Sequence, residues 1–182
     1  MIYKTRSITL KDGRGAILRA PRESDAEEML EYLRTASGET DFLASYPEEL
    51  KFTAEGERAY LKNNLDSPNT MMLVCDVDGK IAGNSQIVFM SSLKTRHRAA
   101  VMIGLLREYW GLGIGSALFR EMEREAREHG TAQLELEMIE GNDRALALYR
   151  SAGFETMAEH PDAFRLRDGT SRAAVFMRKV LK

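Results

Sequence analysis

Three glycines at every second position, Gly111, Gly113 and Gly115, separate an apolar run from a charged amphipathic segment. The run before them, residues 99–106, predicts a strand that is buried on both faces, and residues 114–129 predict a helix. Glycine lets the backbone approach a ligand closely, and the first N–H groups of a helix have no partner within it. With the partial positive charge of the helix dipole, the turn predicts a site for a phosphate or pyrophosphate group.

The spacing of this glycine turn differs from that of two other phosphate-binding loops. The dinucleotide fingerprint requires G-x-G-x-x-G, and the P-loop requires a Gly-Lys-Ser/Thr ending. Neither pattern occurs here. A glycine turn can also be a tight strand-to-helix connection that binds nothing, so the turn alone leaves that alternative open.

A second group of polar residues lies on the strand expected at residues 133–139 and on the helix after it. The strand alternates, and its polar face carries Glu135 and Glu137. Asn142 then has the residue type of a helix N-cap, and Tyr149 follows on the apolar face of that helix. Each has a purely structural alternative, because exposed strand carboxylates, capping asparagines and core tyrosines are all common.

The two blocks together resemble the GCN5-related N-acetyltransferase (GNAT) superfamily. The glycine turn resembles its Gln/Arg-x-x-Gly-x-Gly/Ala signature, with Trp110 where the family has Gln or Arg. The block from Leu134 to Phe154 is similar to the family pattern L-x-V…N-x-x-A-x-x-L-Y-x-x-x-G-F, with Met138 for the usual Val. Within it, the run around Glu137 also resembles the bacterial ribosomal-protein N-terminal acetyltransferases.

The resemblance implies an N-acetyltransferase that uses acetyl-CoA as co-substrate and needs no metal. It implies that the pantetheine arm pairs with backbone groups left free at Ile103, Gly104 and Leu105, and that Asn142 contacts the cofactor arm. The pyrophosphate is then expected on the turn formed by Gly111, Leu112, Gly113, Ile114, Gly115 and Ser116.

Acetyl transfer requires an amine to lose a proton and a thiolate to leave, and a proton donor helps the thiolate. The resemblance implies Tyr149 as the donor to the sulfur and Glu137 as the base. Glu135 lies on the same polar face of this strand, and solvent can also take the proton. The sequence therefore leaves three candidates for the base: Glu137, Glu135 and solvent. The apolar strand at residues 99–106 has no acid, although many family members carry one there.

The remaining pattern predicts a mixed α/β protein. Helices are expected from the Ser24-to-Glu27 capping box to Gly38, from the cap Thr53 to about Leu65, at residues 114–129 and at 142–153. Strands are expected at residues 7–10, 16–19, 71–77, 80–90, 99–106, 133–139, 154–164 and 171–180. With the resemblance, this order implies one GNAT domain over residues 1–182, with a mixed central β-sheet of splayed parallel strands flanked by helices.

Composition narrows the partners and the compartment. The 182 residues carry a net charge of −2, which argues against general nucleic-acid binding. No apolar run is long enough to span a membrane, and no signal-peptide pattern opens the sequence. The one cysteine cannot form an internal disulfide, so a cytoplasmic protein is expected. The sequence leaves open whether the protein forms a homodimer.

The expected acceptor is a primary amine of a small molecule or a peptide. Residues 23–57 hold eleven acids and two bases, a balance that can attract a cationic amine but is also explained by two solvated helix faces. The loop with Lys94, Arg96, His97 and Arg98 can likewise meet an outlying phosphate or face only solvent. The alternative function is an acyl-CoA-binding sensor without turnover, which the presence of Asn142 and Tyr149 disfavours.

Overall fold

The computed structural model describes residues 3–181. Its strands are β1 (Arg6–Thr9), β2 (Gly15–Arg19), β3 (Thr70–Val77), β4 (Lys80–Phe89), β5 (Arg98–Leu105), β6 (Gln133–Ile139), β7 (Glu155–Arg165) and β8 (Ser171–Val180). Its α-helices are α1 (Ala26–Glu39), α2 (Ala54–Asp66), α3 (Ile114–Glu128) and α4 (Asp143–Ser151). Hydrogen-bonded strands follow the order β1-β2-β3-β4-β5-β6-β8-β7 in one mixed sheet. The expected α/β class and element order are confirmed.

The chain divides into two compact units. The first unit contains the residues up to 88 together with residues 102–118. The second contains residues 89–101 together with the residues from 119 onward. Both β5 and α3 therefore begin in one unit and end in the other.

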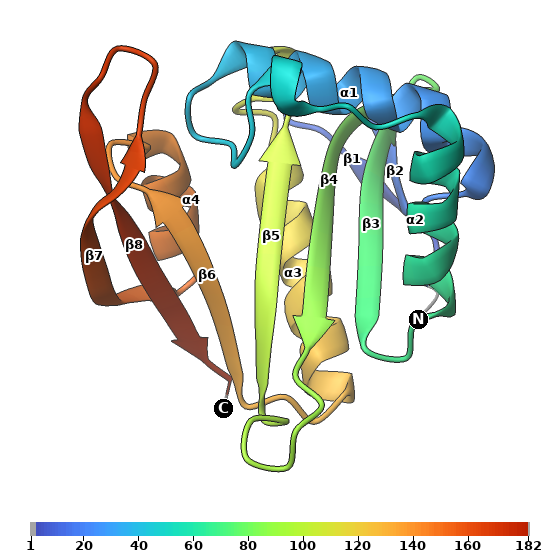
Figure 1. Ribbon diagram of the computed structural model, residues 1–182. Helices are drawn as coiled ribbons and strands as arrows, with labels where there is room; N and C mark the ends of the chain where they lie inside the picture. Colours follow the sequence, from blue (N-terminus) through green and yellow to red (C-terminus); the bar gives the residue numbers. More distant parts are fainter. Residues whose placement is uncertain (1–2, 182) are drawn as a thin grey trace. The chain divides into compact units, whose positions relative to one another are not determined.

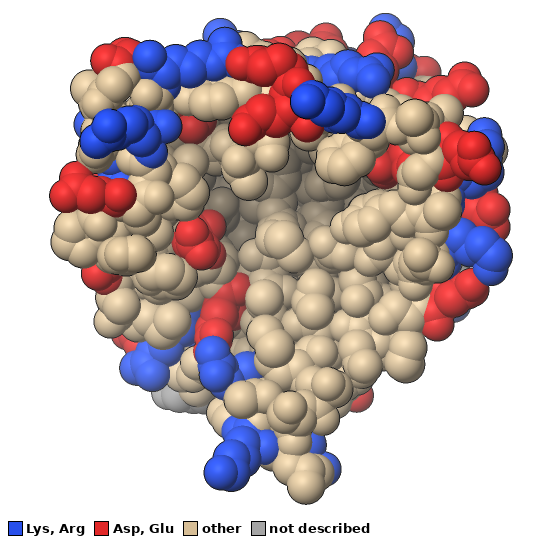
Figure 2. Space-filling model, in the orientation of Figure 1, with Lys and Arg blue, Asp and Glu red and all other residues tan. Residues whose placement is uncertain are grey.

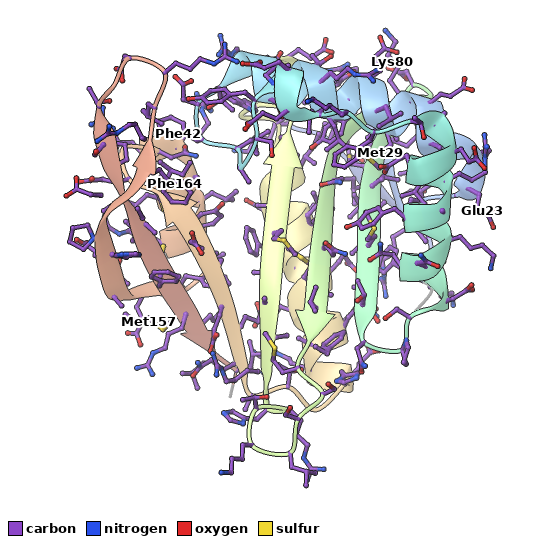
Figure 3. The ribbon with its side chains drawn as sticks, viewed as in Figure 1. Glu23, Met29, Phe42, Lys80, Met157 and Phe164 are labelled. Atoms are coloured by element: carbon purple, nitrogen blue, oxygen red, sulfur yellow. The ribbon has the colours of Figure 1, made fainter. Side chains whose placement is uncertain are left out.

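The first unit is built on an antiparallel run of strands from β1 to β4. Helix α2 packs against both β3 and α1 (Figure 1). The core includes Met29 and Tyr32 of α1, Leu61 of α2 and Val74 of β3. Met29 is fully buried and points from α1 toward the sheet (Figure 3), as is typical of the apolar face of an amphipathic helix.

The second unit joins a parallel pair to an antiparallel hairpin. Strand β5 pairs in parallel with β6 from Arg98 opposite Gln133 to Ala100 opposite Glu135. Strand β8 lies between β6 and β7 and is antiparallel to both (Figure 1). Phe119 of α3 packs edge-on against Tyr149 at 5.6 Å and against Phe154 at 5.5 Å between ring centroids. This aromatic cluster attaches α4 to the rest of the second unit.

Helix α1 departs from the expected start and end. A 3-10 turn at Glu23–Asp25 precedes it, and Asp25, not Ser24, is the N-cap residue. The Asp25 carboxylate accepts the N–H of Arg22 at 2.7 Å, so it organises the turn before the helix. Gly38 lies inside α1, and the helix ends where Thr40 becomes extended.

The expectation that β5 is buried on both faces is wrong for its second half. Ala99 and Val101 are buried, whereas Met102 is 49% exposed and Ile103, Gly104 and Leu105 are only partly buried. The run is apolar throughout, but one face of the strand is open at this point. Hydrophobicity alone cannot distinguish an apolar strand covered on two faces from one that is covered on one face.

Candidate active site

The glycine turn of the first unit has the local geometry of an anion site. Gly111 and Gly113 have φ of 80° and 91°, a left-handed conformation that favours glycine. The N–H of Ala117 donates to the carbonyl of Gly113 at 3.0 Å, so Gly113 caps α3. The N–H groups of residues 114–116 precede that first helical bond, and the first turn of α3 contains no acid. Backbone donors and the positive end of the helix dipole therefore coincide here.

Trp110 fastens the end of β5 to this turn. Its indole N–H donates to the carbonyl of Leu105 at 2.9 Å, and the guanidinium of Arg107 lies 5.5 Å from its ring centre. One of the two lone pairs of the Leu105 carbonyl oxygen is therefore already used, and the other remains for a further donor. Trp110, which stands where the family signature has Gln or Arg, thus has a structural role.

Lys11 lies against the same turn, a contact that no sequence pattern indicates. Its backbone N–H donates to the carbonyl of Leu112 at 3.1 Å. A Cβ atom placed on Gly113 would lie 3.7 Å from Lys11 Cγ and 3.8 Å from Lys11 Cε, so the lysine side chain crosses the glycine. Lys11 is on the tight turn between β1 and β2, about a hundred residues before the glycines, and no local pattern connects the two segments.

Strand β5 meets β4 and α1 closely at Gly104. A Cβ atom on Gly83 of β4 would lie 2.8 Å from the carbonyl oxygen of Gly104, and one on Gly104 would lie 2.8 Å from the hydroxyl oxygen of Tyr32. The Tyr32 hydroxyl in turn accepts the N–H of Asn84 at 3.3 Å. Sequence reasoning missed Tyr32, although its position three residues after Met29 placed it on the apolar face of α1.

The two acids on β6 are in different environments. Glu135 accepts two hydrogen bonds from Arg98 and one from Gln133, and these lower the pKa of its carboxyl group. Glu137 is exposed and has no hydrogen-bond or ion-pair partner among residues 3–181. Both point away from the buried face of Leu134, Leu136 and Met138, as the alternation predicted.

Asn142 and Tyr149 lie on α4 in the predicted positions. The Asn142 side-chain oxygen accepts the N–H of Ala145 at 3.2 Å, so it caps the helix and leaves its amide N–H₂ for other partners. Tyr149 is 8% exposed and packs within the aromatic cluster. Burial raises the pKa of its hydroxyl to about 12, so the group keeps its proton at neutral pH. Its hydroxyl makes no hydrogen bond within the described part of the chain.

A family model described as the Acetyltransferase (GNAT) family matches residues 28–154. The chain belongs to the GNAT acetyltransferase family. This confirms the family and the acetyltransferase activity inferred from the two sequence blocks. The match includes the glycine turn, Glu137, Asn142 and Tyr149, whose individual roles stay predictions.

Solved structures agree with the fold of this GNAT protein. It is 27% identical to an acetyltransferase of the GNAT family from Streptococcus pneumoniae, with a TM-score of 0.85 over 91% of this chain and 99% of that one. It is also 27% identical to ribosomal-protein-alanine N-acetyltransferase from Brucella melitensis, with a TM-score of 0.77 over 90% and 99%. An acetyltransferase from Salmonella typhimurium, solved with its cofactor acetyl-CoA, shares the fold at 18% identity, a TM-score of 0.78 and coverage of 92% and 94%.

Several acids of residues 23–57 in this GNAT chain serve the fold. Asp25 pairs with Arg19 at 2.6 Å, Glu28 accepts the N–H of Ile81 at 2.6 Å, and Glu39 accepts the N–H of Arg107 at 2.7 Å. Glu57 is 5% exposed, and burial raises the pKa of its carboxyl group. The acidic surface available to an acceptor is therefore smaller than the eleven acids of the sequence suggest.

The basic residues of the loop between β4 and β5 also differ in whether they pair within the fold or face solvent. Figure 2 shows its lysine and arginine side chains at the bottom of the view. Arg98 pairs with Glu135, whereas Lys94, Arg96 and His97 are exposed. This supports a solvated loop, with Arg98 committed to the fold.

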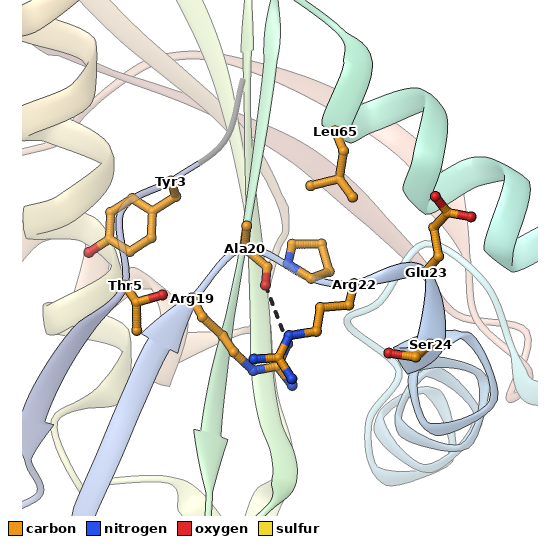
Figure 4. Close-up of a pocket in the computed structure, with 9 residues that line it drawn as sticks. Tyr3, Thr5, Arg19, Ala20, Arg22, Glu23, Ser24 and Leu65 are labelled. Atoms are coloured by element: carbon orange, nitrogen blue, oxygen red, sulfur yellow. Dashed lines mark hydrogen bonds between the residues drawn. The ribbon is translucent and has the colours of Figure 1, made fainter.

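The first unit contains a cavity of about 520 Å³, whose lining includes Tyr3, Arg19, Arg22 and Leu65 (Figure 4). Its charged lining residues are Arg19, Arg22 and Glu23, and Arg19 binds Asp25 at 2.6 Å and Asp76 at 3.1 Å. Because those two carboxylates neutralise the Arg19 guanidinium, and Arg22 and Glu23 carry opposite charges, the lining attracts an anion little. None of the residues expected to bind the cofactor lines it.

Three further features concern metal ions, membranes and the single cysteine. Within residues 3–181, no group of three or more His, Cys, Asp and Glu side chains could hold a metal ion. No helix in that part of the chain is both long and apolar enough to cross a membrane. Cys75 is completely buried, and burial raises the pKa of its thiol to about 12, which favours a packing role.

Proposed function

We propose that this protein transfers the acetyl group of acetyl-CoA to a primary amine of a small molecule or a peptide, by direct attack of the amine on the thioester. The observation that carries the proposal is the left-handed glycine turn at the start of α3 in a chain of the GNAT family. The acetyl-CoA bound to the Salmonella typhimurium protein of the same fold supports the choice of cofactor.

The cofactor is held by backbone groups first. The pyrophosphate accepts hydrogen bonds from the N–H groups of residues 111–116, where the helix dipole favours negative charge. The pantetheine arm pairs with the backbone of residues 103–105, using the lone pair that Trp110 leaves at Leu105. Asn142 contributes its side-chain N–H₂ to the cofactor arm while its oxygen caps α4.

Two side chains move protons in the proposed reaction. Glu137, which has no cationic partner in the described chain, takes a proton from the incoming ammonium through water. The amine nitrogen then bonds to the carbonyl carbon, and the C–S bond breaks. Tyr149 gives its proton to the departing thiolate, a role that suits a tyrosine that is still protonated at neutral pH. The attacking nitrogen then loses its second proton to the Tyr149 phenolate through water, which leaves a neutral amide and the CoA thiol.

Two classes of acceptor are supported by different observations. Similarity to a ribosomal-protein-alanine N-acetyltransferase supports a peptide N-terminal amine as one candidate. A cationic small molecule is the other, attracted by those acids of residues 23–57 that have no structural partner. Capture of a cationic acceptor should weaken as ionic strength rises, because exposed charges are screened beyond about 8 Å at physiological salt.

A thiol-release assay tests the proposal. Purified protein and acetyl-CoA are incubated with polyamines, aminoglycosides, amino acids and N-terminal peptides, and free CoA thiol is measured with time. Acceptor-dependent thiol release with a matching acetylated product supports the transferase. Tight binding of acetyl-CoA by calorimetry without release with any acceptor would instead identify a sensor, and absence of binding would reject the cofactor assignment.

A further inference from the structure

The Tyr32 hydroxyl lies against the strand expected to hold the pantetheine arm. The tyrosine is 4% exposed and extends from α1 toward the sheet of the first unit. Its hydroxyl oxygen lies 2.8 Å from the position that a Cβ atom on Gly104 would occupy, and Leu43 Cδ2 lies 3.9 Å from the same point. The phenol oxygen is therefore next to the backbone of β5 at Gly104.

The hydrogen bonding of this hydroxyl is only half complete. A phenol hydroxyl can both accept and donate a hydrogen bond. The Tyr32 oxygen accepts the backbone N–H of Asn84 at 3.3 Å. Within residues 3–181, nothing accepts the proton of the Tyr32 hydroxyl. The hydroxyl therefore has an unused donor beside the cofactor strand, where it can donate to an atom of a bound ligand.

Two physical effects prepare the hydroxyl for donation. Burial, with a smaller contribution from the charge of Glu39, raises its pKa well above the usual range, so it stays protonated. The N–H of Asn84 withdraws electron density from the phenol oxygen, and such chains of hydrogen bonds strengthen the next donor.

We propose that the Tyr32 hydroxyl donates a hydrogen bond to the carbonyl oxygen of the bound acetyl thioester. This inference rests on the proposed function, in which the pantetheine arm follows residues 103–105 and brings the thioester to the strand that Tyr32 contacts. When the amine nitrogen bonds to the carbonyl carbon, the π electrons of the C=O bond move to oxygen. Tyr32 stabilises that negative charge and keeps its own proton. When the electron pair on oxygen returns to re-form the C=O bond, the C–S electron pair leaves with sulfur.

The arrangement also explains the glycine at position 104. Gly104 does not have a positive φ, so its backbone conformation does not require glycine. The space for a side chain is taken by the Tyr32 hydroxyl, because a Cβ atom 2.8 Å from that oxygen would force one of them to move. Gly104 thus lets the tyrosine reach the cofactor strand.

The test is Tyr32→Phe, which keeps the ring and removes the donor. Loss of one oxyanion donor lowers kcat by about 10²- to 10³-fold, and we expect such a loss with little change in the Kd of acetyl-CoA. With acetyl-CoA labelled with ¹³C at the carbonyl carbon, the bound resonance of the native protein should lie downfield of that of the free cofactor. In the variant it should move back toward the free value.

Tyr60→Phe is the matched control. Tyr60 is 46% exposed on α2, and its hydroxyl contacts only the side chain of Gln86, at 3.5 Å. This variant should keep the native kcat and carbonyl resonance. If Tyr32→Phe behaves like Tyr60→Phe in both measurements while the native enzyme still acetylates, the role of Tyr32 is rejected and the proposed function stands. If the native protein binds no acetyl-CoA, both are rejected.

Gly104→Ala provides a second route if Tyr32→Phe folds poorly. Its methyl group displaces the hydroxyl without removing it. We expect the same upfield movement of the carbonyl resonance and a similar loss of kcat. The double variant with Gly104→Ala and Tyr32→Phe should lose little more of kcat than either single variant, because both substitutions remove the same hydrogen bond. Fully additive losses, or an unchanged resonance in Gly104→Ala, would overturn the inference.

Discussion

Arg98 and Glu135 form a two-point ion pair, in which Arg98 Nε and Nη2 each donate to one carboxylate oxygen at 2.5 Å. Both residues lie in the second unit, where β5 and β6 run in parallel. This ion pair engages the carboxylate of Glu135. Glu135 lies on the same polar face of β6 as Glu137 and is the other candidate side chain for the base. A carboxylate with a lowered pKa is a weaker base, so the pairing favours Glu137.

Glu137→Gln should reduce kcat most at neutral pH, where the amine is almost entirely charged, and less at high pH, where free amine is available. The rate of the variant should therefore rise more steeply with pH than that of the native enzyme, because it depends on free amine alone. Steady-state rates from pH 6 to 10 measure this. A flat defect across that range would contradict the assignment.

Glu135→Gln is the control for that experiment, and its effect should be on stability. Arg98 lowers the pKa of Glu135 in the folded state, so the pair stabilises the protein above the unfolded pKa and is lost as pH falls through the folded value. Denaturant unfolding at pH 7 should show a loss of about 1 kcal/mol, because the pair is partly exposed. The loss should shrink toward pH 3. Abolished activity in this variant, with Glu137→Gln unaffected, would transfer the base to Glu135.

Tyr149→Phe should lower kcat by about 10²- to 10⁴-fold with little change in cofactor affinity. The ring keeps its contacts with Phe119 and Phe154, so the melting temperature should change little. Because the pKa of Tyr149 is raised to about 12, no loss of activity below pH 10 should come from its ionisation. An acetyl donor with a better leaving group should recover part of the rate, and no recovery would argue against proton donation to sulfur.

Gly113→Asp should weaken acetyl-CoA binding strongly. It places a carboxylate at the start of α3 and a side chain where φ is 91°. Gly169→Asp is the matched control, because Gly169 has φ of 83° in open space on the β7–β8 turn. Calorimetric titration should show the loss only for Gly113→Asp. Undiminished binding in a folded Gly113→Asp variant would remove the glycine turn from the cofactor site.

Lys11→Gln should weaken binding of acetyl-CoA by roughly 3- to 10-fold at low salt, because it removes a cation that crosses Gly113. The difference from the native protein should shrink in 0.5 M salt. Lys80→Gln, at the start of β4 on the surface (Figure 3), is the charge-matched control. Equal affinities for Lys11→Gln and Lys80→Gln at low salt would show that Lys11 only packs on the turn.

The sequence by itself determined those features that depend on neighbouring residues. Thr53 and Asn142 cap helices, Asp78-Gly79 forms a left-handed hairpin turn, and the glycines before α3 adopt positive φ, because each depends on local backbone chemistry. The family was recognisable for the same reason, since its two blocks are contiguous segments. The Ser24 cap failed because Asp25, which binds Arg19, organises the start of α1.

Only the tertiary structure decided which side chains from distant segments meet. Lys11 reaches Gly113, Tyr32 reaches Gly104, and Arg98 takes Glu135. These partners are separated in the sequence by about 100, 70 and 37 residues, and no local pattern records such a contact. Helical or strand periodicity states which face a residue is on, but packing chooses what that face touches. The partners of the predicted residues, and hence the choice between Glu135 and Glu137, therefore depend on the assembled fold.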